Sequence, residues 1–314
     1  MSVNSKLAFV FPGQGSQKIG MLAEIASEYS IVAETFAEAA EVLGYDAWDM
    51  LQNGEQDDIN QTERTQPILL TASVSLWRVW AERQGQSPAL LAGHSLGEWS
   101  ALVCAGVVEF VDAVNLVRLR GAYMQEAVPR GQGAMAAVLG LDDVAIKACC
   151  EQAAQGEEVV PVNFNAPGQV VIAGTSSGVE RAIVLCKEAG AKRAMPLAVS
   201  APFHTQMMKP AADKLATHLT QVAFNAPQIP VVQNVRGEIE TDSQKIRDLM
   251  IEQIYSPVQW VDCVKTLVSQ GVQVTVECGP GKVLCGLNKR IDKSLQSLST
   301  DTLSSLGEAL ETAG

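Results

Sequence analysis

The segment Gly93-His94-Ser95-Leu96-Gly97 has the spacing G-x-S-x-G. It follows a short apolar run, Ala89–Ala92, and opens a segment with a helical pattern at about 96–105. This context is typical of a nucleophile elbow, in which a sharp strand-to-helix turn exposes the serine oxygen. The glycines leave room for the turn, and the first amides of the helix can stabilise an oxyanion. The alternative interpretation is that Ser95 only caps the helix.

A second candidate is an arginine on the apolar side of a helix expected at 111–126. At about 100° per residue, Arg120 falls among apolar side chains, whereas Arg118 falls on the polar arc. A buried guanidinium without a partner costs several kcal/mol, so Arg120 needs an anion. Two partners are open: an Asp or Glu of the chain, or a substrate carboxylate held by two parallel hydrogen bonds.

His204 follows Ser200-Ala201-Pro202-Phe203 and lies between an expected strand and an expected helix. The pKa of histidine lies near neutrality, which suits a base that takes a proton from a serine. A histidine on a loop is nevertheless more often structural, so its residue type leaves the role open. His94 lies within the elbow and can face the same site.

The loop Phe11–Gln17 follows the first apolar run. The spacing of Gly13, Gly15 and Gly20 does not fit the dinucleotide fingerprint G-x-G-x-x-G, and no Gly-Lys-Ser/Thr forms a P-loop. Two interpretations remain: a loop whose backbone amides point into a site, or only a tight turn between a strand and a helix.

The composition excludes several classes of protein. A net charge of −12 argues against nucleic acid or an anionic membrane as partner, and no apolar run of about 18 residues predicts a membrane span. Three histidines are too few and too scattered to indicate a zinc site, so we expect no metal. Seven cysteines without CxxC spacing and no recognisable export signal indicate reduced thiols in a cytoplasmic protein.

Apolar patterns alternate between strand and helix through most of the chain, which predicts an α/β domain with a largely parallel sheet. The expected strands are Leu7–Phe11, Ala89–Ala92, 229–233 and 272–277. The expected helices are Gly20–Leu43, Thr71–Arg83 after Pro67, 96–105, 111–126, 206–221 and 243–253.

A different pattern interrupts this alternation. The order β-α-β-β-α-β within about seventy residues is that of a ferredoxin-like unit. Its expected elements are Ala134–Leu139, Asp142–Ala154, Val159–Asn165, Gln169–Ala173, Gly178–Ala189 and Ala194–Val199. We therefore predict a large domain of residues 1–127 and 200–314 with a small domain, 128–199, inserted into it.

Several of these motifs, in this order, resemble those of malonyl-CoA:acyl-carrier-protein transacylases, the stand-alone enzymes of type II fatty acid synthesis. The matching segments are Phe11–Gln17 (FPGQGSQ), Thr65–Leu69 (TQPIL), Gly93–Glu98 (GHSLGE), Arg120, Ser200–His204 (SAPFH) and Val276–Leu284 (VECGPGKVL). The resemblance covers nearly the whole chain. It implies an α/β-hydrolase-like large domain with a ferredoxin-like insertion, in agreement with the element pattern.

The resemblance also implies an activity: transfer of malonyl from malonyl-CoA to the phosphopantetheine thiol of acyl-carrier protein, without a cofactor, through a malonyl-serine. It gives Ser95 as nucleophile, His204 as its base and the backbone carbonyl of Gln253 as the group that orients the base. The remaining implied roles are backbone oxyanion donors (Gln14, Leu96), the malonyl carboxylate site (Arg120), the acyl pocket (Gln66, His94) and phosphates of coenzyme A or the carrier (Lys192, Arg193).

Alternatives remain from the sequence. An acyl-thioester hydrolase uses the same elbow, a non-catalytic protein can bind the carrier, and a trans-acting acyltransferase can serve a polyketide pathway. Phe203 departs from many stand-alone members and resembles the malonyl-selective modules of polyketide synthases. A ring at this position narrows an acyl pocket against branched groups.

Overall fold

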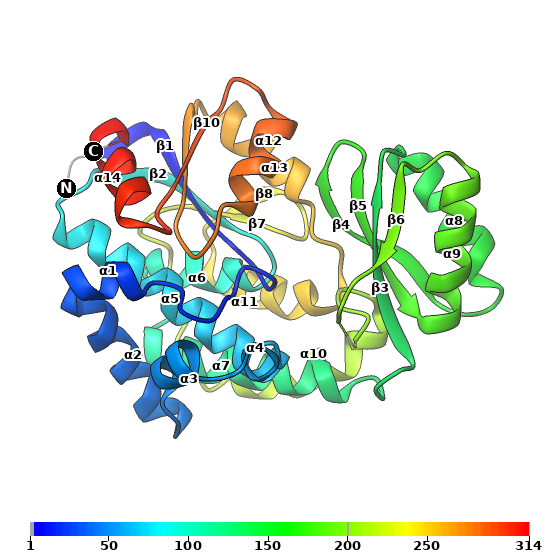
Figure 1. Cartoon of the computed structure of the whole chain (residues 1–314), viewed down its shortest axis with the longest axis horizontal. Helices are drawn as coiled ribbons and strands as arrows, with labels where there is room; N and C mark the ends of the chain where they lie inside the picture. Colours follow the sequence, from blue (N-terminus) through cyan, green and yellow to red (C-terminus); the bar gives the residue numbers. More distant parts are fainter. Residues whose placement is uncertain (1–2, 200, 314) are drawn as a thin grey trace.

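The computed structural model describes residues 3–199 and 201–313, and Figure 1 shows two lobes, each built on its own sheet. Ser200, which begins the motif ending at His204, lies outside the described residues. Within them the larger sheet has six strands, and every neighbouring pair is parallel except β7 and β8. Their spatial order is β10 (Gln296–Ser299), β9 (Val274–Glu277), β1 (Val3–Phe11), β2 (Ser87–Gly93), β7 (Val231–Gln233) and β8 (Glu238–Glu240).

The smaller lobe is an antiparallel sheet with two helices on one face (Figure 1). Its strands lie in the order β4 (Val159–Ala166), β5 (Gln169–Thr175), β3 (Gly133–Leu139) and β6 (Arg193–Pro196), and its helices are α8 (Asp143–Ala154) and α9 (Ser176–Glu188). This is the ferredoxin-like order. The predicted fold class is therefore confirmed, whereas the domain boundaries at 128 and 199 stay a prediction.

The other helices surround the larger sheet. They are α1 (Ala23–Glu28), α2 (Ser30–Leu43), α3 (Ala47–Asn53), α4 (Gln56–Ile59), α5 (Thr62–Glu82), α6 (Leu96–Cys104), α7 (Phe110–Glu126), α10 (Lys209–Leu219), α11 (Ser243–Glu252), α12 (Trp260–Ser269), α13 (Val283–Ile291) and α14 (Leu303–Ala313), with short 3-10 turns at Gln206–Met208 and Gln253–Tyr255.

Two predicted helices differ from the structure. The helix expected at Gly20–Leu43 is two helices, because Tyr29 between them has an extended backbone. The helix expected to begin at Thr71 begins at Thr62 and contains Pro67. A proline near the start of a helix removes only one hydrogen bond of the first turns, so it does not end a helix that is buried along its length. The elements α3, α4, α12, α13, α14, β8 and β10 were not predicted.

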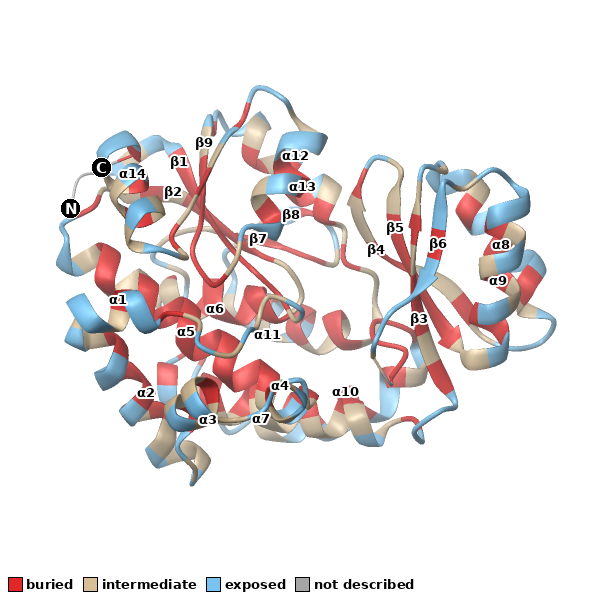
Figure 2. Cartoon of the chain, in the orientation of Figure 1, coloured by how far each residue is buried: buried red, intermediate tan, exposed pale blue. Residues whose placement is uncertain are grey.

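The apolar run of β1 follows from its central place in the sheet. Leu7, Phe9 and Phe11 pack into the core beneath α2, α5 and α6, while Ala8 and Val10 face a second core formed with α12 and α13. A strand that is covered on both faces has no polar side, which explains the continuous run. Figure 2 shows this strand buried along most of its length.

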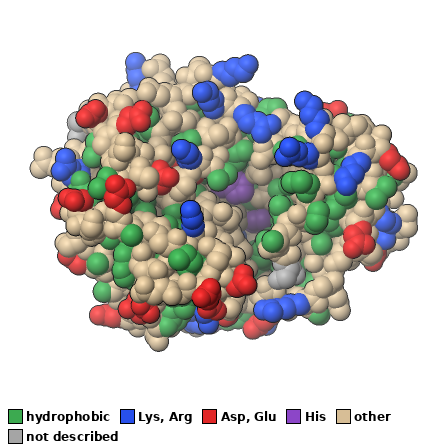
Figure 3. Space-filling model, in the orientation of Figure 1, with side chains coloured by type: hydrophobic (Ala, Val, Ile, Leu, Met, Phe, Trp, Pro, Cys, Tyr) green, Lys and Arg blue, Asp and Glu red, His purple; other side chains and the backbone are tan. Residues whose placement is uncertain are grey.

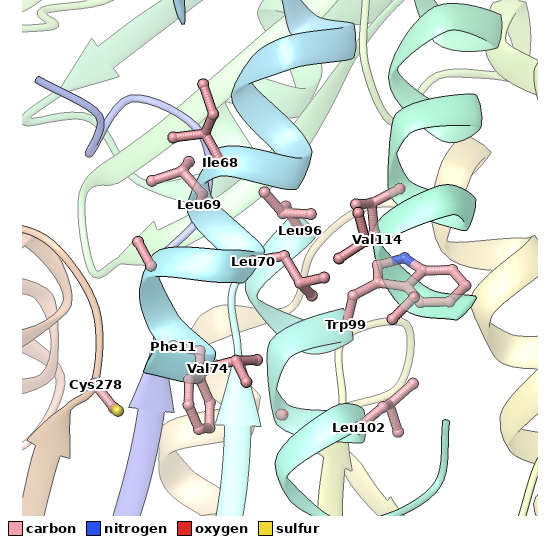
Figure 4. Close-up of a cluster of buried hydrophobic side chains, with 14 of the residues drawn as sticks. Phe11, Ile68, Leu69, Leu70, Val74, Leu96, Trp99, Leu102, Val114 and Cys278 are labelled. Carbon is pink, nitrogen blue, oxygen red and sulfur yellow. The ribbon is translucent and has the colours of Figure 1, made fainter. Parts of the chain in front are cut away.

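The helix that follows Ser95 is fixed by its own buried face. Figure 4 shows Leu96, Trp99 and Leu102 of α6 pointing into a cluster with Leu70 of α5 and Val114 of α7. All three α6 side chains are at most 1% exposed. Because these side chains are buried in a close-packed interior, α6 cannot move without opening cavities. The core below α6 therefore sets the position of the elbow.

Candidate active site

Ser95 lies in a strained turn between β2 and α6, with φ 53° and ψ −108°. The turn needs both flanking glycines, because a Cβ at Gly97 would lie 2.0 Å from the carbonyl oxygen of Phe11, and one at Gly93 would lie 2.0 Å from the backbone of Gly97. Strain of this kind persists only where the surrounding structure imposes it. The serine is therefore held at the end of the sheet with its hydroxyl exposed to a cavity.

The hydroxyl of Ser95 meets a correctly oriented histidine. Its Oγ lies 2.7 Å from Nε2 of His204, and Nδ1 of His204 lies 2.8 Å from the backbone oxygen of Gln253. A carbonyl oxygen only accepts, so Nδ1 carries the hydrogen and Nε2 presents its lone pair to the serine. Burial, and then the charge of Arg120, lower the pKa of His204 to about 3. The imidazole is thus neutral and able to accept a proton.

Arg120 is 2% exposed, as its position on the helix predicted, and two amide oxygens hold it. Its Nη1 donates to Oε1 of Gln66 at 2.8 Å and its Nη2 to Oε1 of Gln253 at 2.9 Å. Its Nη2 also lies 3.3 Å from Oγ of Ser95. Across residues 3–199 and 201–313, no Asp or Glu forms an ion pair with it, and its Nε has no hydrogen-bond partner. The sequence left two partners open for Arg120, an Asp or Glu of the chain or a substrate carboxylate. The first of these is not found among the described residues.

These groups open into a cavity of about 310 Å³ between the two sheets. Figure 3 shows a hollow between the lobes with histidine side chains at its floor. One wall comes from the larger lobe and the other from the smaller lobe and the segment after it. The lining residues are Gln14, Gln66, His94, Ser95, Leu96, Arg120, Met124, Met135, Ala137, Asn163, Asn165, Gln169, Val171, Leu197, Val199, Phe203 and His204.

Nearly all residues predicted for the site therefore come together, and two do not. Lys192 and Arg193 do not line this cavity; they lie with Arg290 around a separate surface pocket of about 370 Å³. His94 contacts Asn165, with Nε2 2.7 Å from Oδ1, and burial lowers its pKa. Phe203 lies in the cavity wall.

Several polar residues of the site were not found from the sequence. Oδ1 of Asn234 accepts from the N–H of Ser95 at 2.7 Å, and its Nδ2 donates to the carbonyl of Gly93 at 2.6 Å, so one side chain ties the elbow together. Its only signal was a polar residue at the end of a parallel strand, where sites of α/β proteins lie. Glu98 is 1% exposed on α6, and the helical wheel that singled out Arg120 could have found it. Asn163 lines the cavity, and its buried Oδ1 has no partner among the described residues.

No ion site emerges from the described part of the chain, where no three His, Cys, Asp or Glu side chains are grouped as metal ligands. All seven cysteines are free thiols. Within the same residues, no helix combines the length and the apolar character needed to cross a bilayer.

Comparison with known proteins places this site in a family. Residues 8–306 match the acyl transferase domain family. The malonyl CoA-acyl carrier protein transacylase of Escherichia coli K12 is 58% identical over 307 residues, which cover 98% of this chain and 99% of that protein. The chain belongs to the malonyl CoA-acyl carrier protein transacylase family. The Bacillus subtilis transacylase is 44% identical over 98% of this chain and 97% of its own length.

Solved transacylase structures share the fold over the whole chain. An acyl carrier protein S-malonyltransferase from Vibrio cholerae has a TM-score of 0.95 at 60% identity. The match covers 97% of this chain and 99% of that one. A malonyl-transacylase in complex with a type II PKS acyl-carrier protein has a TM-score of 0.97 at 54% identity, with 98% of this chain matching 99% of that one. The two-sheet arrangement of the transacylase is therefore common to the family.

Proposed function

We infer that the protein transfers the malonyl group of malonyl-CoA to the phosphopantetheine thiol of an acyl carrier protein in fatty acid synthesis. One observation carries this: a nucleophile, its base and a buried cation meet within one cavity, with Nη2 of Arg120 3.3 Å from Oγ of Ser95. A cation beside the acyl position selects an acyl group with a free carboxylate, and malonyl has one. The transacylase relatives support the same substrate and acceptor.

In the first half of the reaction, Nε2 of His204 takes the proton of Ser95 as its oxygen attacks the thioester carbon. The oxyanion rests on the backbone amides of Gln14 and Leu96, which line the cavity at the N-terminal end of α6. The carbon–sulfur bond then breaks, and the proton moves from His204 to the sulfur of coenzyme A. The product is malonyl-Ser95.

The second half reverses these steps with a different thiol. The phosphopantetheine thiol gives its proton to His204, its sulfur attacks the malonyl ester, and Ser95 leaves with the proton. Throughout, the carbonyl of Gln253 keeps the imidazole in one tautomer, while Arg120 holds the malonyl carboxylate beside Gln66. All steps use side chains and amides of the chain itself, and we propose that the reaction needs no cofactor.

Both candidate acceptors are acyl carrier proteins. The names of the transacylase relatives give an acyl carrier protein as the acceptor, and we propose the carrier of fatty acid synthesis as the first candidate. A carrier of polyketide synthesis is the second candidate, because a 54% identical malonyl-transacylase is bound to a type II PKS acyl-carrier protein. We propose that Lys192 and Arg193 meet phosphates of coenzyme A or the carrier. A cytoplasmic location stays a prediction.

An intact-mass measurement tests the function. Protein incubated with malonyl-CoA should gain one malonyl group on Ser95 and lose it when holo-carrier is added. Ser95→Ala should gain none, because no other hydroxyl lies within hydrogen-bond distance of His204 Nε2 in the described residues. Ser177→Ala, a change at an exposed serine of the smaller lobe, is the control and should label normally.

Two outcomes would contradict the proposal. Persistent labelling of Ser95→Ala would remove the nucleophile assignment. Rapid release of free malonate, unaffected by the carrier, would instead indicate an acyl-thioester hydrolase.

A further inference from the structure

Glu98 is a buried carboxylate next to the catalytic groups, and the mechanism above does not use it. It lies at the start of α6 and is 1% exposed. Its Oε2 accepts from Nε2 of Gln253 at 2.6 Å, and its Oε1 accepts from the backbone N–H of Asn234 at 3.2 Å. Both contacts are with neutral groups. A buried carboxyl group in this setting needs a reason to be there, because burying a polar group costs free energy that its hydrogen bonds must offset.

The side chain of Gln253 connects this carboxylate to the reacting groups. Its Nε2 donates to Glu98 and to the backbone oxygen of Ser95 at 2.9 Å, and its Oε1 accepts from Arg120. The backbone oxygen of the same residue accepts from His204. Gln253 thus contacts the nucleophile, the base and the buried cation at once.

The orientation of an amide depends on what surrounds each of its ends. The backbone oxygen of Ser95 can only accept, so it requires the NH₂ end of Gln253 to face it. The same NH₂ group donates to Oε2 of Glu98. The oxygen end then has to face Arg120. If the amide were reversed, its oxygen would meet the backbone oxygen of Ser95 and its NH₂ group would meet the guanidinium.

We propose that Glu98 is a positioning residue that fixes the side-chain amide of Gln253, and thereby holds Arg120 in place for an anionic acyl group. The proposal rests on the proposed function, because it assigns Glu98 a part in selecting malonyl. It differs from a purely structural role in one respect: the loss of Glu98 changes which acyl group is preferred.

The interposed amide explains how Arg120 stays both charged and available. A carboxylate in direct contact would occupy the guanidinium fork with two parallel hydrogen bonds, and the substrate would have to displace it. When Glu98 is ionised, its charge opposes the lowering of the Arg120 pKa by burial without contacting the guanidinium. The substrate carboxylate then meets a cation whose contacts are neutral amides. Burial raises the pKa of Glu98 to about 8, and the contacts with Gln253 and Asn234, together with the Arg120 charge, act against that rise.

The decisive test measures the rate of Ser95 acylation by malonyl-CoA and by acetyl-CoA in Glu98→Gln. A glutamine at this position has one oxygen for two donors, so its NH₂ end opposes either Gln253 or the Asn234 N–H. We expect the malonyl-over-acetyl preference to fall about tenfold or more, the range for losing a hydrogen bond to a charged group. Glu277→Gln is the matched control, because Glu277 is also a buried glutamate but lies at the end of β9. The malonyl-over-acetyl preference of Glu277→Gln should equal that of the wild type.

Two further variants make the outcome unambiguous. Glu98→Asp keeps the carboxyl group but withdraws it from Gln253, and it should show an intermediate malonyl-over-acetyl preference even if Glu98→Gln fails to fold. The exchange Glu98→Gln with Gln253→Glu conserves charge and volume but places the carboxylate against Arg120, so the preference should stay lost.

An unchanged preference in folded Glu98→Gln or Glu98→Asp, or a preference restored by the exchange, would overturn the proposal. Neither result would touch the proposed function, which the malonyl adduct on wild-type Ser95 tests separately.

Discussion

At the scale of single residues, the buried charges of the site control one another. Burial and the Arg120 charge keep His204 neutral, and burial lowers the pKa of Arg120 to about 10, so that it stays protonated near neutral pH. A substrate carboxylate that binds Arg120 offsets part of its charge. Binding of malonyl therefore makes the neighbouring imidazole more basic at the moment when it has to accept the proton of Ser95.

Replacing the cation tests its role in selection. Arg120→Ala should lower the rate of Ser95 acylation by malonyl-CoA about 10²-fold more than that by acetyl-CoA, because only malonyl loses a charged partner in a buried site. Stopped reactions analysed by intact mass measure both rates. Arg118→Ala, on the same helix but bonded to Asn115, is the control and should leave the preference intact. Equal losses of rate for the two acyl groups would contradict the role of Arg120 in binding the malonyl carboxylate.

The low pKa of His204 predicts how stability depends on pH. The unfolded chain binds a proton at this histidine below a pKa of about 6.5, whereas the folded protein does so only below about 3. Between these two pKa values, this group lowers the free energy of unfolding by up to about 1.4 kcal/mol for each unit by which the pH falls. His204→Gln lacks this contribution, so its free energy of unfolding should fall less steeply than that of the wild type.

Urea denaturation of both proteins from about pH 7 to about pH 4 measures this difference. Parallel profiles for wild type and variant would show that His204 titrates normally in the folded protein.

At the scale of elements, the elbow depends on how closely α6 approaches β1. A methyl group at Gly97 would lie 2.0 Å from the carbonyl oxygen of Phe11 and 2.8 Å from that of Pro12. Both atoms belong to the backbone and cannot rotate away. The same approach places the loop containing Gln14 beside the first turn of α6, which brings both proposed oxyanion donors to one cavity.

Gly97→Ala should therefore destabilise the protein by about 1–3 kcal/mol or more, since the helix must move off the strand. Gly307→Ala is the control: it lies within α14 with nothing within 4 Å of the added carbon. That change should be neutral or stabilising by up to about 1 kcal/mol. Thermal unfolding measures the melting temperatures of the two variants. Similar values for both would show that the elbow can relax to accept the added methyl group.

At the scale of the whole molecule, the cavity exists because two sheets face each other. Met135 and Val171 of the smaller lobe line it opposite Ser95 and Arg120 of the larger lobe. The smaller sheet also has a core of its own beneath α8 and α9, which includes Val138, Ile146, Val170 and Ile172. One of its faces is thus covered from within and the other by the larger lobe.

This division predicts that residues 128–199 fold alone, with low stability. A chain of this size has a small core, and here it loses the cover of one sheet face. The isolated fragment should show a mixed helix and strand circular dichroism spectrum and a cooperative thermal transition below that of the full chain. A spectrum of an unfolded chain would show that the insertion needs the larger lobe to fold.

The sequence by itself determined the helices and strands with a clear hydrophobic period. It also determined the residues whose type costs free energy where they lie, such as a charged residue on an apolar helix face. The G-x-S-x-G spacing after an apolar run located Ser95, and the apolar side of a helix showed that Arg120 is buried, because both signals are local. The split at Tyr29 and the start of α5 before Pro67 were missed, because tertiary packing outweighs local propensity there.

Only the tertiary structure decided which groups touch. The contacts of Gln253 with Glu98, Arg120 and His204 join segments more than 40 residues apart, and no spacing along the chain encodes them. The partner of Arg120 was open for the same reason. A helix pattern shows that a charge is buried, but only the packing of α5, α7 and the Gln253 turn shows that neutral amides hold it and leave it to a substrate.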